Sequence, residues 1–293
     1  IDMLRAELGG VSHFVTLGDG AIRPDWVPFG EWGERSIDRY RQGDSVAAPE
    51  DGSPVLQASQ RHYVLPQGWV ERDRKGNDAS GFAYAIFDRF EGQRLAETVI
   101  AYRGTEILSG RDWLIGNVLG AQNRRGWAVA KGVRKTLDDK QLHDTNLVVT
   151  GHSLGGGIAQ YVSLRNVGGK QPAKVSKSIV FDNSPRYWRP FKPVDGVERI
   201  AVAERGEALA AIRWTRPKVG GQKSLTLNCQ RGFNAFKGHK IVPLANCLTW
   251  IAAFKDPAAC DSIRRNPEIG RPETQVPPDV PECPRTGETS ARP

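Results

Sequence analysis

The sequence predicts an α/β fold in which a mostly parallel sheet is flanked by helices and led by an antiparallel hairpin. Two β-rich runs, 81–90 and 95–105, are separated by a short polar connector, as the strands of a hairpin are. Short apolar runs then alternate with segments of helical periodicity, a pattern typical of parallel sheets covered by helices. A serine between glycines, in GHSLGG, stands where one of these runs ends.

The elements around that serine are expected in the order helix, strand, helix. Residues 124–139 carry apolar side chains at helical spacing, and 146–150 (NLVVT) has the composition of a short buried strand. After the serine, an apolar residue recurs every four positions from Leu154, which predicts a helix lying against a sheet.

Two more strands and one helix are expected downstream. The apolar runs 177–181 and 199–203 are typical of strands. Residues 239–254 form an amphipathic helical pattern, with Pro243 in the first turn, where proline is tolerated.

The chain is expected to divide into three regions. Residues 1–75 have many turn residues and weak periodicity, so they are expected to form helices and loops packed on the core. Residues 76–265 form the α/β domain, and the proline-rich, polar residues 266–293 form a C-terminal tail.

Composition and charge limit the classes of function. No run approaches the roughly 18 apolar residues that a membrane span needs. Lys and Arg exceed Asp and Glu by 41 − 33 = 8, which favours an anionic partner such as phospholipid or nucleic acid, or is simply a solvated basic surface. We expect peripheral contact with a membrane surface and no nucleic acid. The first ten residues lack the features of a signal peptide.

The cysteines leave the compartment open. All four lie in the last quarter of the chain, at Cys229, Cys247, Cys260 and Cys283. None forms a C-x-x-C pair, so no metal site is expected. Two disulfides with three possible pairings would suit a chain that is secreted or delivered outside the cytoplasm, and free thiols would suit a cytoplasmic one.

Ser153 is the candidate nucleophile. Gly151, Ser153 and Gly155 form a G-x-S-x-G turn between a strand-like and a helix-like run, the context in which such a turn exposes a serine hydroxyl. The alternative is a glycine-rich turn with an idle serine. At a helix N-terminus, backbone N–H groups also stabilise a developing oxyanion.

His239 is the candidate base by chain order. Five histidines are present: His13, His62, His143, His152 and His239. When a nucleophile stands on such a turn, the acid and then the histidine follow it, and only His239 lies after Ser153. His152 adjoins the serine and cannot turn back to its hydroxyl.

The acid must lie between these two residues, near the C-terminal end of a strand. The intervening candidates are Asp182, Asp195, Glu198, Glu204 and Glu207. We favour Glu207, because the turn ERGE carries it beyond a strand end towards His239. Glu204 and Asp182 are alternatives, whereas the other two precede the strand 199–203 and belong to its opposite end.

Two backbone N–H groups are expected to bind the oxyanion. One belongs to Leu154, directly after the serine, and the other to Thr105 in AYRGTE, at the end of the hairpin's second strand. The alternative is that RGT is only a turn.

With YRGT followed by VVTGHSLGGGIAQ, the sequence resembles the class 3 lipase family over about residues 80–255. The resemblance implies an α/β-hydrolase fold and a serine lipase or phospholipase that needs no metal or organic cofactor. It also places an oxyanion role on Thr105. Family members normally use aspartate as the acid, so Glu207 in RGEALA departs from the pattern.

The expected function is therefore cleavage of lipid acyl esters through an acyl-enzyme. The basic balance favours phospholipid, in the manner of a phospholipase A and of a bacterial enzyme delivered against a rival's membrane. The alternatives are a triacylglycerol lipase, a soluble esterase or thioesterase, and a catalytically inactive binding module. Residues 112–120 and 216–238 are candidate lids.

Overall fold

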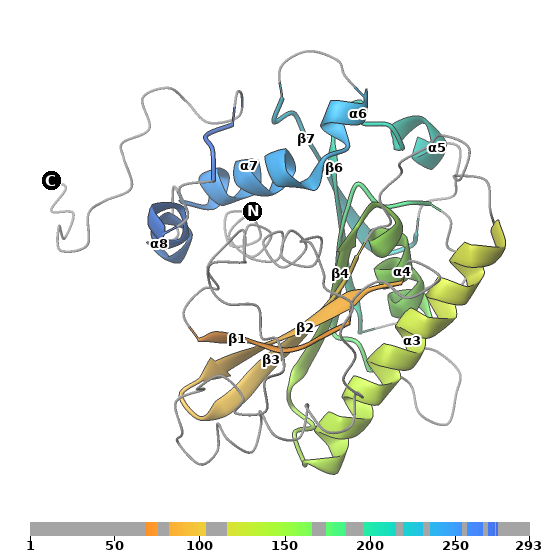
Figure 1. The fold of residues 1–293 in the computed structure, drawn as a ribbon, viewed down its shortest axis with the longest axis vertical. Helices are drawn as coiled ribbons and strands as arrows, with labels where there is room; N and C mark the ends of the chain where they lie inside the picture. Colours follow the sequence, from red (N-terminus) through yellow and green to blue (C-terminus); the bar gives the residue numbers. More distant parts are fainter. Residues whose placement is uncertain are drawn as a thin grey trace, which may run out of the picture.

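The chain folds around a single sheet, and the computed structural model describes it from residue 68 onward with gaps (Figure 1). The described residues are 68–75, 82–103, 116–165, 174–185, 196–214, 219–230, 235–253, 257–265, 269–272 and 274. The strands are β1 (Trp69–Lys75), β2 (Tyr84–Glu91), β3 (Arg94–Tyr102), β4 (Asn146–His152), β5 (Lys177–Phe181), β6 (Glu198–Glu204) and β7 (Gln222–Leu227). The helices are α3 (Gly116–Asp139), α4 (Ser153–Leu164), α5 (Ala210–Trp214), α6 (Ala235–Gly238), α7 (Ile241–Ala253) and α8 (Pro257–Arg265).

The sheet has seven strands in chain order, from β1 to β7. β1, β2 and β3 pair antiparallel, whereas every later neighbour pairs parallel. The predicted hairpin and the mostly parallel α/β sheet are thereby confirmed. In a parallel sheet the C-terminal ends of the strands meet at one edge, and the pairing of Tyr102 with Gly151 brings the end of β3 beside the glycine-flanked serine.

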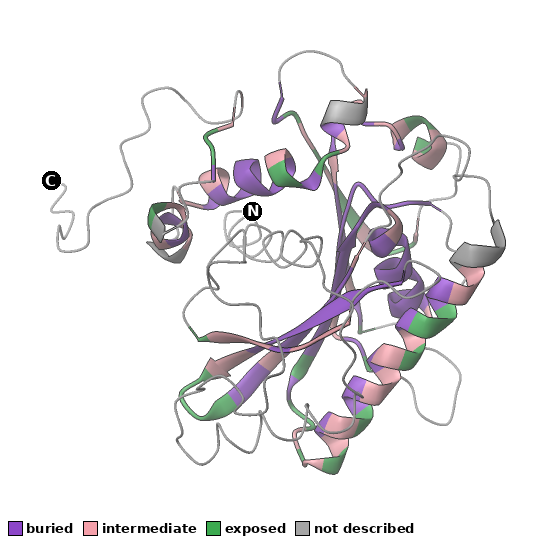
Figure 2. Ribbon diagram, viewed as in Figure 1, coloured by how far each residue is buried: buried purple, intermediate pink, exposed green. Residues whose placement is uncertain are grey.

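Helices cover both faces of the sheet (Figure 1). Along β4, Leu147 and Val149 pack with α3 and α4, while Val148 points to the other face. Phe181 of β5 belongs to a cluster with Leu244 of α7. This alternation of period two buries the central strands on both sides (Figure 2).

Several boundaries differ from the predicted ones. α3 begins at Gly116, before the expected start at 124, and β4 continues beyond residue 150 to His152. The segment of β1 was expected to form helices and loops, because its sequence WVERDRK lacks an apolar pattern. It forms a strand in which Arg72 is buried and paired with Asp88 at 2.9 Å. Residues 216–238 include β7, a half-exposed edge strand, so this part of the expected lid belongs to the sheet.

The C-terminal quarter is attached to the sheet covalently and by packing. Cys229, just after β7, forms a disulfide with Cys247 of α7, which is one of the three possible pairings. Cys260 is disulfide-bonded as well. At the start of the expected tail, Ile269 is buried and its carbonyl accepts a hydrogen bond from Trp250.

Most of residues 1–75 and of the tail lie outside the described residues. In the part of the chain that is described, no helix has the length and apolar character needed to cross a bilayer.

Candidate active site

Ser153 stands at the sharp turn from β4 into α4. β4 ends at His152 and α4 begins at Ser153, whose φ of 53° lies in the left-handed region that side chains rarely adopt. Such strain is held only where the surrounding structure enforces it, and it is typical of a nucleophile turn. The turn brings the serine to the edge of the sheet at the C-terminal end of β4.

The glycines of the turn are required by close backbone contacts. A Cβ atom on Gly155 would lie 2.1 Å from the carbonyl oxygen of Tyr102 and 2.7 Å from the carbonyl carbon of Arg103. A Cβ on Gly151 would lie 2.4 Å from the carbonyl carbon of Gly155. Both positions therefore exclude any side chain, and α4 packs directly on the end of β3.

His239 links the serine to an acid. It lies between α6 and α7, with Nε2 2.8 Å from Ser153 Oγ and Nδ1 2.6 Å from Glu207 Oε2. Because the carboxylate can only accept, the matching tautomer carries its proton on Nδ1 and leaves Nε2 to accept the serine hydroxyl. The structure thus brings together the three side chains that the sequence singled out.

Glu207 is buried and held from three directions. The turn after β6 carries it past the strand end, and its Oε2 also accepts the N–H of Leu209 at 2.8 Å. Its Oε1 forms an ion pair with Arg213 of α5. Burial of a carboxyl group is costly unless the group is paired and hydrogen-bonded, as Glu207 is here.

The two alternative acids have other partners. Glu204 accepts the backbone N–H groups of Cys229 at 2.9 Å and Gln230 at 3.2 Å, and burial raises its pKa. Asp182 accepts the N–H of Glu204 at 2.9 Å. Burial, followed by the nearby charge of Glu207, raises the pKa of Asp182 well above its usual value.

His152 and Arg213 are the site residues that sequence reasoning missed. The ring of His152 packs 4.9 Å from the ring of His239, centroid to centroid, and its side chain hydrogen-bonds the backbone of His239. Burial, and then the charges of His239 and Arg213, lower the pKa of His152 to about 3. Its position beside Ser153 was the available signal, whereas the contact of Arg213 depends on α5, which no periodicity announced.

The oxyanion residues are only partly described. Leu154 lies in the first turn of α4, where N–H groups have no partner within the helix. Thr105 lies outside the described residues, which end at Arg103 and resume at Gly116.

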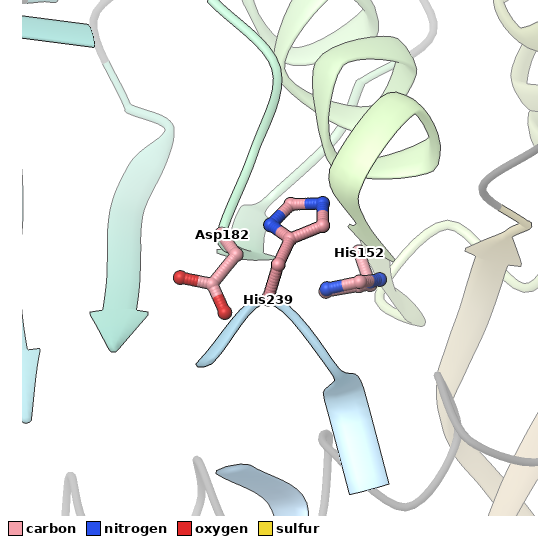
Figure 3. Close-up of side chains that lie close together, drawn as sticks. All are labelled: His152, Asp182 and His239. Atoms are coloured by element: carbon pink, nitrogen blue, oxygen red, sulfur yellow. The ribbon is translucent and has the colours of Figure 1, made fainter. Parts of the chain in front are cut away.

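One group of side chains near the serine has the composition of a metal site. His152, Asp182 and His239 offer ligand atoms within 4.8 Å of one another, and His239 lies between the other two (Figure 3). Each ring nitrogen of His239 already has a partner: Nδ1 contacts Glu207 and Nε2 contacts Ser153. A cation held by His239 would therefore have to break one of these two contacts.

A segment of the chain that contains Ser153 is similar to a known family. Residues 58–173 match a family model described as a phospholipase-like, Tle-like phospholipase domain. The match supports a lipase/phospholipase family. The matched range contains β1 to β4, α4 and Ser153, and it ends before Glu207 and His239. It supports a hydrolase of lipid esters.

Comparison with curated proteins found no match. Among solved structures, esterase 2 of Thermogutta terrifontis, phosphoramylated by tabun, is 12% identical with a TM-score of 0.37, covering 62% of this chain and 88% of that chain. M37 lipase is 12% identical with a TM-score of 0.43, covering 91% and 95% respectively. A Pyrobaculum calidifontis esterase is 12% identical with a TM-score of 0.34, covering 83% and 91%.

Proposed function

We propose that this chain is a serine hydrolase that cleaves an acyl ester of phospholipids, as a phospholipase A does. The observation that carries the proposal is the continuous contact from Glu207 through His239 to Ser153, with distances of 2.6 and 2.8 Å. A serine hydroxyl is a poor nucleophile until a positioned base removes its proton, and this contact supplies that base.

The reaction proceeds through two acyl transfers. Ser153 Oγ attacks the acyl carbonyl carbon while its proton passes to His239 Nε2, and the carbonyl oxygen becomes an oxyanion. The N–H of Leu154, with Thr105 as the second donor, binds that oxyanion. His239 then protonates the leaving alcohol. Water repeats the sequence on the acyl-enzyme, which releases the fatty acid and restores the serine.

The remaining contacts hold the imidazole of His239 in the orientation and tautomer that the reaction needs. Glu207 orients the ring and stabilises the imidazolium formed during attack, and Arg213 and the N–H of Leu209 hold the carboxylate in place. His152 packs against the same ring, on the side opposite Asp182 in Figure 3, and so supports the imidazole.

Phospholipid is proposed as the substrate on the basis of charge and of the family match. The net charge of +8 favours accumulation of the protein at an anionic interface. We further propose that the chain acts outside the cytoplasm of the cell that makes it. The Cys229–Cys247 disulfide supports this, because disulfides persist in oxidising compartments.

Labelling with a fluorophosphonate probe tests the nucleophile. The native protein should be labelled at Ser153, and Ser153→Ala and His239→Ala should not react. Ser224→Ala removes a hydroxyl from the exposed face of β7 and is the matched control, which should react as the native protein does. Equal labelling of native protein and Ser153→Ala would overturn the assignment.

Fatty acid release tests the substrate. We expect release from phosphatidylglycerol vesicles to exceed release from triacylglycerol emulsions at equal interfacial area. A preference for the emulsion would indicate a neutral-lipid lipase. Turnover of soluble esters or thioesters alone would indicate a soluble esterase, and the absence of both labelling and turnover would indicate a catalytically inactive binding module.

A further inference from the structure

Two large apolar side chains are exposed in the part of the chain that the structure describes. Trp214 is 90% exposed and Val242 is 44% exposed. A tryptophan almost completely in water is unusual, because its side chain carries a large apolar surface that folding normally buries. Singly exposed apolar residues are common at protein surfaces, but an indole that is 90% exposed leaves an unusually large apolar area in water.

Both side chains belong to the elements that carry the acid and the base. Trp214 ends α5, directly after Arg213, which is paired with Glu207. Val242 lies in the first turn of α7, three residues after His239. α5 and the start of α7 are therefore both at the sheet edge where Ser153 lies, and α5 has no buried residue, as its intermediate and exposed colours in Figure 2 show.

The positive charge of the protein is concentrated in the same stretch. Residues 205–253 contain eight Lys and Arg but a single acidic residue, Glu207, which is buried. This stretch contributes 8 − 1 = +7 to a net charge of +8 over the whole chain. Arg205 and Lys240, which flank the acid and the base in sequence, are exposed.

We propose that Trp214, Val242, Arg205 and Lys240 form a docking surface for an anionic phospholipid bilayer, which presents Ser153 to the lipid. The inference rests on the proposed function and assigns the surface through which that function reaches its substrate. Tryptophan favours the headgroup region, where its ring is half in apolar surroundings, and basic side chains bind anionic headgroups.

A protein partner fits these observations less well. A stable protein interface buries about 800 Å² on each partner, around a packed apolar core. Two separate apolar side chains fall far short of such a core. At a membrane interface, by contrast, binding strengthens with buried apolar area and with attraction to anionic lipids, so an indole and several cations contribute without a packed core.

Binding is measured with the Ser153→Ala protein, so that no lipid is consumed. The protein is sedimented with vesicles of equimolar phosphatidylcholine and phosphatidylglycerol, and with pure phosphatidylcholine vesicles. Adding Trp214→Ala should lower the partition coefficient for the anionic vesicles by about tenfold or more, because the loss of the indole removes on the order of 100 Å² of buried apolar surface. Trp214→Phe should retain most of the binding.

Two lysine variants distinguish the effect of positive charge at the docking surface from the effect of the overall net charge on vesicle binding. Lys240→Gln should weaken binding to the anionic vesicles several-fold, since each basic residue near the surface contributes about 1 kcal/mol. Lys135→Gln is the matched control: Lys135 is 67% exposed near the end of α3, which leads into the N-terminal end of β4 at the opposite edge of the sheet. It should change binding little.

Three results would overturn the docking surface. They are equal partition of the Trp214→Ala and parent proteins, equal losses from the two lysine variants, and equal binding to neutral and anionic vesicles. All binding is measured with proteins that lack the nucleophile, so a failure of the docking proposal is distinct from a failure of the proposed ester cleavage. That failure would appear instead as absent labelling of Ser153 in the native protein.

Discussion

Replacing Glu207 with glutamine keeps the shape of the side chain, removes its charge and tests the proposed triad directly. Both carboxylate oxygens are in use. Oε2 accepts the N–H of Leu209 at 2.8 Å and lies 2.6 Å from His239 Nδ1, while Oε1 pairs with Arg213. Glutamine offers one oxygen and one NH2 group, so one side of the site must meet a donor in place of an acceptor.

Either orientation of the glutamine disturbs catalysis. If its NH2 group faces His239, the ring proton moves to Nε2, and the imidazole can no longer accept the proton of Ser153. If the NH2 group faces Arg213, two donors oppose each other and the imidazolium loses its counter-charge. In a serine protease triad the wrong tautomer lowers kcat by about 10⁴-fold, so we expect a loss of about 10³- to 10⁴-fold here.

The assay is the rate of fluorophosphonate labelling, together with hydrolysis of a soluble ester. Glu204→Gln is the matched control, because it makes the same chemical change in a buried side chain that accepts the N–H groups of Cys229 and Gln230. The control should lose stability but retain its rate within about tenfold. Equal losses in the two variants, or a nearly native rate for Glu207→Gln, would refute the assignment of the acid.

Three further predictions concern the structure that supports the site. Gly155→Ala should destabilise the fold by about 1–3 kcal/mol and slow labelling, because its Cβ would meet the backbone of Tyr102 at 2.1 Å. Replacing Cys229 and Cys247 together by alanine should lower the free energy of unfolding by about 3 kcal/mol, given a separation of 18 residues. His152→Gln should remove a pH dependence of stability. The pKa of His152 falls from 6.5 to about 3 on folding, so below pH 6.5 the unfolded chain binds a proton that the native protein does not. The free energy of unfolding of the native protein should therefore decrease by about 2 kcal/mol from pH 7 to pH 5, and that of the variant should not.

Denaturant unfolding measures all three effects. Gly120→Ala, on α3 with open space around the added Cβ, is the control for crowding and should not destabilise the protein. An unchanged midpoint in the cysteine variant would contradict the contribution of the cross-link. For His152, parallel stability curves of native and variant proteins between pH 5 and 7 would contradict burial of a neutral ring. Comparing the two proteins also cancels Asp182, whose raised pKa acts in the opposite direction.

The central part of the fold could be predicted because its signals are local. The β4 and α4 segments have apolar patterns with different periods, and the glycines between them are demanded by contacts within the same turn. The hairpin was visible for the same reason, since its two strands are neighbours in sequence. Where burial and periodicity agree, a single sequence is sufficient.

The missed strands are those whose burial does not follow hydropathy. β1 contains Arg72, which is buried because Asp88 and Thr98 on other strands accept its charge and hydrogen bonds. β7 lies at the edge of the sheet and is half exposed, so its residues need no apolar pattern. Both strands are defined by partners that are distant in sequence.

The acid shows the same limit within the site. Asp182 follows the end of β5, Glu204 ends β6 and Glu207 lies in the turn after β6, and the sequence favoured Glu207 only because that turn could extend it towards His239. The structure separates them through backbone contacts: Glu204 is occupied by the amides after β7, and Asp182 by the amide of Glu204. The contact between Glu207 and His239 agrees with the sequence prediction, while the catalytic roles and the contribution of Thr105 stay predictions.

The distances along the chain between the three side chains affect when the site can form during folding. Ser153 and His239 are 86 residues apart, and His239 and Glu207 are 32 apart. Closing such large loops is entropically costly, and parallel pairing of high contact order is slow. The serine turn is local and can form early, but the relay requires β5, β6 and α7 to dock first. The reactivity of Ser153 therefore reports whether folding is complete. On refolding, this reactivity should recover after helical and strand structure has returned.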